Sequence, residues 1–71
     1  MKRRWLFVVE TDQGVGYLLE TGGMVRFPDE ATEWVGTSPA ADIEAKRRMD
    51  AYDQMTGGYV NRIIYESKGR A

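Results

Sequence analysis

The segment 5–9, with the sequence WLFVV, constrains the fold of this chain more than any other feature. Five consecutive apolar residues of aromatic and branched type are typical of a β-strand that is buried on both faces. Such a strand needs a neighbour along each edge, so we expect it in the middle of a sheet. Alternating residues at 15–19 and the segment 24–27, MVRF, predict two more strands, with glycine-containing turns between them. These segments predict an antiparallel meander.

The clearest helix signal begins at Ser38-Pro39, because serine is a favoured N-cap and proline fits the first helical position. The helix should run from about Pro39 to Met55 and end at the glycines 57–58, one of which supplies a left-handed cap. One apolar stripe follows this helix, at positions 41, 45, 49, 52 and 55. We expect this stripe to pack on the sheet.

A last strand over 59–67 completes an α+β fold, an antiparallel sheet of four strands with one helix packed on one face. Residues 32–35 would make a fifth strand, so the order along the chain is β-β-β-(β)-α-β. We expect the last strand beside the first, giving the order 5-1-2-3, with residues 32–35 at the far edge. The chain, 1–71, forms a single compact domain, with 68–71 as a frayed tail.

One helix cannot cover a sheet of this size completely, so an apolar face should stay open. If the pleat is not reversed, its candidates are Leu6, Val8, Leu18, Val60 and Ile64. An open apolar face would allow a homodimer, which is one structural role for the chain.

The residue types that are missing limit the chemistry, because the chain contains no cysteine and no histidine. Disulfides, thiol catalysis, cysteine zinc sites and histidine-based triads are therefore excluded. We expect no enzymatic activity, no cofactor and no metal site. The longest apolar run is segment 5–9, so we expect no membrane association and a cytoplasmic location.

The charges of the chain are segregated by sign although the net charge is only −1. Residues 1–9 carry a net charge of +3, residues 10–44 carry −7 and residues 45–71 carry +3. Folding either interleaves these blocks or leaves the middle one as an acidic surface. In the second case, carboxylates around an exposed Trp34 would suit docking on a partner protein with a basic surface. The candidate protein-binding residues are Asp29, Glu30, Glu33, Trp34, Asp42, Ile43 and Glu44.

Two other interpretations remain open. Trp34 can instead belong to the core, with the carboxylates serving solubility and Ile43 covered by the segment near Trp34. Alternatively, basic residues of the helix and the N-terminus can bind nucleic acid, although an isoelectric point near 5.3 argues against a dedicated DNA-binding protein. The candidates for this alternative are Arg3, Arg4, Lys46 and Arg47.

The order of a β-meander, a helix capped at Ser38-Pro39 and a closing strand through 59–65, YVNRIIY, resembles small accessory proteins of phages and prophages. Anti-CRISPR proteins belong to this group, and some of its members are stoichiometric inhibitors of host nucleic-acid machinery. The resemblance lies in size and architecture, so it assigns no role to any residue. It implies a protein-binding inhibitor in the host cytoplasm, without catalysis.

Overall fold

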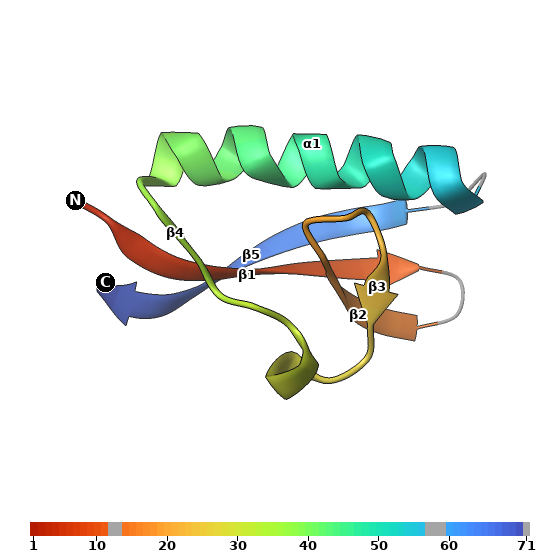
Figure 1. The fold of residues 1–71 in the computed structure, drawn as a ribbon, viewed down its shortest axis with the longest axis horizontal. Helices are drawn as coiled ribbons and strands as arrows, with labels where there is room; N and C mark the ends of the chain where they lie inside the picture. The colour runs from red at the N-terminus through yellow and green to blue at the C-terminus, as the bar shows by residue number, and fades with distance from the viewer. Residues whose placement is uncertain (12–13, 57–59, 71) are drawn as a thin grey trace.

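Strand β1 (Arg3–Thr11) is the centre of the fold in a computed structural model that describes residues 1–11, 14–56 and 60–70. Within these residues the sheet has five strands, all paired antiparallel, and helix α1 lies over one of its faces (Figure 1). The predicted α+β class and the presence of a strand near 32–35 are therefore confirmed. The other elements are β2 (Gly14–Leu18), β3 (Met24–Val25), the 3-10 helix η1 (Pro28–Glu30), β4 (Trp34–Gly36), α1 (Ser38–Thr56) and β5 (Val60–Arg70).

Both edges of β1 are paired, as its uninterrupted apolar run predicts. Strand β5 follows one edge along the whole length of β1. The other edge is shared, because β2 pairs with the end from Val8 to Thr11 and β4 pairs with the start from Arg3 to Trp5. The prediction that residues 32–35 lie at the far edge of the sheet was therefore wrong. Since β2 does not reach residues 3–5, β4 supplies the backbone hydrogen bonds that this part of β1 needs.

The main core lies between α1 and the sheet. Alternate residues of β1 face the helix, and small alanines on α1 allow the two layers to approach closely. The prediction that the apolar stripe of the helix packs on the sheet is therefore confirmed for Ala41, Ala45 and Tyr52. Met55, in the last turn, is exposed instead. The buried core residues are Trp5, Phe7, Val9, Leu18, Ala41 and Ala45, with Met24, Trp34, Tyr52 and Ile63 packed against them.

The face of the sheet away from α1 is less exposed than the predicted open apolar face. Leu6 is only 3% exposed and Val8 is also buried, although both point away from α1. The 3-10 helix η1 lies on this side of the sheet (Figure 1), and Leu6 shares a cleft with Pro28 and Asp29. The connection from β3 to β4 therefore covers part of the face that one helix leaves bare. Of the residues predicted there, Leu18 lies in the main core, Ile64 is partly exposed, and the side chain at position 60 lies outside the described residues.

The start of the helix and the end of the last strand differ from the predicted ones. The helix begins at Ser38, but Thr37 is its cap: the Ala40 N–H donates to Thr37 Oγ1 at 3.4 Å and the Ala41 N–H donates to the Thr37 carbonyl at 2.8 Å. Strand β5 continues to Arg70, where it pairs with Arg3, so residues 68–70 are not a frayed tail. The predicted cap at 57–58 lies outside the described residues.

Candidate protein-binding site

Folding separates the seven candidate protein-binding residues into two groups. Asp29 and Glu30 belong to η1, whereas Asp42, Ile43 and Glu44 belong to α1. These two elements lie on opposite sides of the sheet (Figure 1), so the acidic middle of the sequence does not form one continuous surface.

On α1, the two candidate carboxylates, Asp42 and Glu44, are engaged within the protein. The Tyr65 hydroxyl donates to Asp42 Oδ1 at 2.5 Å, and Lys46 Nζ lies 3.4 Å from Asp42 Oδ2. The Tyr65 hydrogen bond, followed by that of Lys46, lowers the pKa of Asp42, and the same tyrosine bond raises the pKa of Tyr65 to about 12. Asp42 thus fastens the helix to β5 and has a structural role.

Glu44 is held even more firmly, by two arginines. Arg47 donates from Nε and Nη2 at 3.0 and 2.7 Å, and Arg48 Nε donates to Glu44 Oε2 at 2.7 Å. The hydrogen bonds from Arg47, and then from Arg48, lower the pKa of Glu44 to about 2 against the opposing effect of burial. Ile43, 70% exposed between these two carboxylates, has neither the predicted cover near Trp34 nor a free acidic surface around it.

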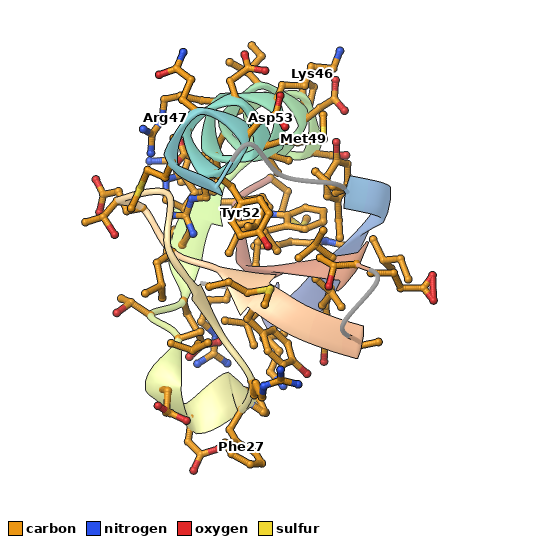
Figure 2. The ribbon with its side chains drawn as sticks, turned by 90° about the vertical axis from the view of Figure 1, so that its right-hand side faces the viewer. Phe27, Lys46, Arg47, Met49, Tyr52 and Asp53 are labelled. Carbon is orange, nitrogen blue, oxygen red and sulfur yellow. The ribbon has the colours of Figure 1, made fainter. Side chains whose placement is uncertain are left out.

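The second group forms what we call the acidic corner: Phe27, Asp29, Glu30 and Glu33. Phe27 has extended backbone and precedes Pro28, which begins η1; the Glu30 N–H donates to the Phe27 carbonyl at 3.1 Å. This turn leaves the Phe27 ring 63% exposed at the end of the molecule far from α1 (Figure 2). Asp29, Glu30 and Glu33 are exposed as well, and Arg4 Nε approaches Glu33 only to 4.0 Å. The corner thus combines an exposed aromatic ring with carboxylates.

A cleft of about 350 Å³ adjoins the acidic corner. Glu20, Glu30 and Glu33 line it together with the half-buried Trp34 and the guanidinium-bearing Arg48. Trp34 also packs on Phe7, with 6.0 Å between the ring centroids, so it belongs partly to the core and partly to the cleft. The cleft favours a cationic group, because its three carboxylates outnumber the one guanidinium, which is paired with Glu44, and the aromatic ring also attracts positive charge.

The basic candidates are not gathered in one place. Arg3 and Arg4 lie at the start of β1, whereas Lys46 and Arg47 are on α1, where they lie on different sides of the helix (Figure 2). Lys46 is bound to Asp42, and Arg47 to Glu44 and, at 3.2 Å, to the Glu20 carbonyl. Two of the four bases are thus paired with carboxylates, and the four lie on two separate elements, so they do not form the clustered positive charge that phosphate recognition needs.

Sequence reasoning did not single out two residues of this region, Phe27 and Glu20. Phe27 was included in the predicted third strand at 24–27, but the strand ends at Val25. The signal was present, because a residue before proline adopts extended backbone and often ends an element. Glu20 gave no such signal, since only the fold brings it near Glu30 and Glu33.

Comparisons of the chain with protein-family models, with curated proteins and with solved structures found no match. In the described part of the chain, no helix is long and apolar enough to cross a membrane. Within those same residues, no group of three or more acidic side chains is arranged to hold a metal ion. A function for this protein must therefore be inferred from the geometry of the acidic corner and its cleft.

Proposed function

We propose that this protein is a non-enzymatic binding module that docks its acidic corner on a basic surface of a partner protein. The observation that carries the proposal is the exposed ring of Phe27 on the same turn as Asp29 and Glu30. Interfaces are anchored by a few central side chains, aromatic ones prominent among them, with polar residues around them. The adjoining cleft has the chemistry to receive an arginine or lysine side chain of the partner, between Trp34 and Glu30.

The charges of the acidic corner support a protein with a basic surface as the partner. Asp29, Glu30 and Glu33 are exposed, and the ion pair between Arg4 and Glu33 is long, at 4.0 Å. Asp42 and Glu44 of α1, in contrast, are bonded within the protein. Long-range attraction to a basic surface would raise the association rate and would weaken with added salt.

A stoichiometric inhibitor is the biological role that we infer for such a module. Proteins that handle nucleic acids carry basic grooves, and an acidic corner with an aromatic anchor can occupy such a groove without any catalytic step. The absence of cysteine and histidine from the sequence agrees with a role without catalysis. A phage accessory protein of the anti-CRISPR type would act in this way.

The test is capture of partners from cell extract on the immobilised protein and three variants. Phe27→Ala removes the anchor, and Asp29→Lys with Glu30→Lys reverses the charge around it. Ile43→Ala is the matched control, because Ile43 is a similarly exposed apolar residue on α1. Loss of a central aromatic anchor should weaken binding at least tenfold, which corresponds to about 1.4 kcal/mol or more.

We expect the wild type and Ile43→Ala to retain the same protein and both acidic-corner variants to lose it. Retention should also fall as salt is added. Equal retention by all four proteins would contradict the proposal, as would retention of nucleic acid in place of a protein.

A further inference from the structure

The outer edge of strand β5 is a second surface with a definite partner chemistry. In the described part of the chain, β5 pairs with β1 alone, so its other edge is without a strand. The strand is eleven residues long, and its pairing with β1 is regular from position 62 to Ser67, between two register shifts. It contains no proline. Proteins usually protect such an edge with proline, bulges or short length, and an unprotected edge pairs readily with another strand.

The residues of this regular stretch favour a second copy of β5 as that strand. In an antiparallel pair of strands related by a two-fold axis, the residue at the axis lies opposite the same residue of the second copy. Choosing this residue fixes the pairing of all the others. Centring the pair on Ile64 sets two isoleucines opposite each other and places Ile63 opposite Tyr65 of the second copy. Apolar, branched and aromatic pairs of this kind stabilise neighbouring strands.

The charges agree with the same register. With Ile64 at the centre, positions 62 and 66 lie opposite each other, and the sequence has an arginine at the first and a glutamate at the second. Centring on Tyr65 would instead place Ile64 opposite Glu66, and centring on Glu66 would bring two carboxylates together, which destabilises a strand pair.

We propose that two copies of this protein form a symmetric dimer by pairing their β5 strands antiparallel, with Ile64 at the two-fold axis. Helix α1 packs against β1, β2 and β5, so it lies over the middle of the sheet. Three strand spacings of about 4.8 Å would separate the two β1 strands, or roughly 14 Å, which leaves room for two helices about 10 Å in diameter. Lys46 and Met49 lie on the side of α1 toward β5 (Figure 2) and would flank the second helix.

The test is the molar mass of the protein by light scattering over a range of concentrations. The wild type should approach twice its 8.1 kDa mass as concentration rises. Ile64 is 38% exposed, so Ile64→Lys and Ile64→Glu should fold, and each alone should be a monomer because like charges meet at the axis. An equimolar mixture of the two variants should recover the doubled mass. Val15→Lys, an exposed position on β2, is the matched control and should remain dimeric.

Recovery in the mixture is specific to a residue that lies opposite itself, so it tests the register as well as the dimer. A wild type that stays at the monomer mass, or a dimer that Ile64→Lys leaves intact, overturns the proposal. Hydrogen exchange of the backbone amides tests the dimer without any variant. The amides along 62–67 should exchange more slowly as the concentration of the wild type rises. Phe27→Ala should not affect the dimer, because Phe27 is not on β5. The dimer can therefore be tested independently of partner binding by the acidic corner.

Discussion

The guanidinium carbon of Arg48 lies 4.5 Å from the centroid of the Phe7 ring, inside the layer between α1 and the sheet. Arg48 is only 3% exposed, and it donates from Nη1 to the Leu18 carbonyl at 3.0 Å and from Nε to Glu44. One cation therefore joins the helix to β1 through the Phe7 ring and to β2 through the Leu18 carbonyl, while Glu44 on the same helix holds the guanidinium in place. It also forms part of the wall of the cleft beside the acidic corner.

Removing Arg48 should destabilise the fold strongly. Arg48→Ala leaves the Leu18 carbonyl without its donor, opens a cavity on Phe7 and takes one partner from Glu44, so we expect a loss of about 3 kcal/mol in the free energy of unfolding. Arg48→Met retains the packing on Phe7 and should lose less. Urea denaturation followed by tryptophan fluorescence measures both variants, and an equal loss for the two would show that packing contributes nothing.

The cap of α1 can be assigned by two single substitutions. Thr37→Ala removes the side-chain oxygen that accepts from the Ala40 N–H and should cost about 1 kcal/mol. Ser38→Ala, one residue later, should leave the stability almost unchanged because Ser38 is already helical. The midpoint of thermal unfolding distinguishes the two, and the opposite order would restore Ser38 as the cap.

Gly22 should not tolerate a side chain, although its neighbour Gly23 should. Gly22 has a φ angle of 95°, and a Cβ atom there would lie 2.8 Å from the Cβ of Ala51, because the turn between β2 and β3 rests on the helix. A Cβ on Gly23 would meet only ordinary contacts, the nearest at 3.7 Å. We expect Gly22→Ala to lose about 2 kcal/mol or more by urea denaturation and Gly23→Ala to lose less than half as much. Similar losses would mean that the turn does not rest on α1.

Glu44 should make part of the stability of the protein depend on pH in the acid range. Its pKa is about 2 in the folded protein and 4.5 as an ordinary glutamate, so the folded state favours the charged form. That stabilisation is complete above pH 4.5 and is lost as the pH falls toward 2. The free energy of unfolding of Glu44→Gln should therefore be lower than that of the wild type at neutral pH and should approach it across this window. Arg47→Gln, which removes the main cause of the shift, should reduce the slope of the wild-type curve.

The sequence predicted those parts of the fold that local patterns decide. The apolar run 5–9 indicated the central strand, and the proline at position 39 marked the start of the helix. The pairing of β4 with the start of β1 was not predictable locally, since it depends on how far β2 extends along the same edge. Burial of Leu6 depends likewise on where the segment between β3 and β4 crosses the sheet.

The site was predicted only in part, for a similar reason. Glu30, Glu33 and Trp34 do line one cleft. The spacing of Glu44 to Arg47 and Arg48 on one helix is that of paired side chains, whereas the bond from Tyr65 to Asp42 joins residues far apart in the sequence. Exposure of Phe27 rather than Trp34 follows from the end of β3 at Val25 and the turn at Pro28. Local helix pairs therefore engage Glu44, and long-range contacts decide the bond of Asp42 and the exposure of Phe27.

The most direct test of the proposed function is an NMR titration of the isotope-labelled protein with an arginine-rich peptide, and in parallel with a DNA duplex. We predict that the peptide shifts the amide resonances of Phe27, Glu30 and Trp34, that Phe27→Ala and added salt reduce these shifts, and that the duplex leaves the spectrum unchanged. Shifts from the duplex at Arg3, Arg4, Lys46 and Arg47, without any response of the acidic corner to the peptide, would contradict the account.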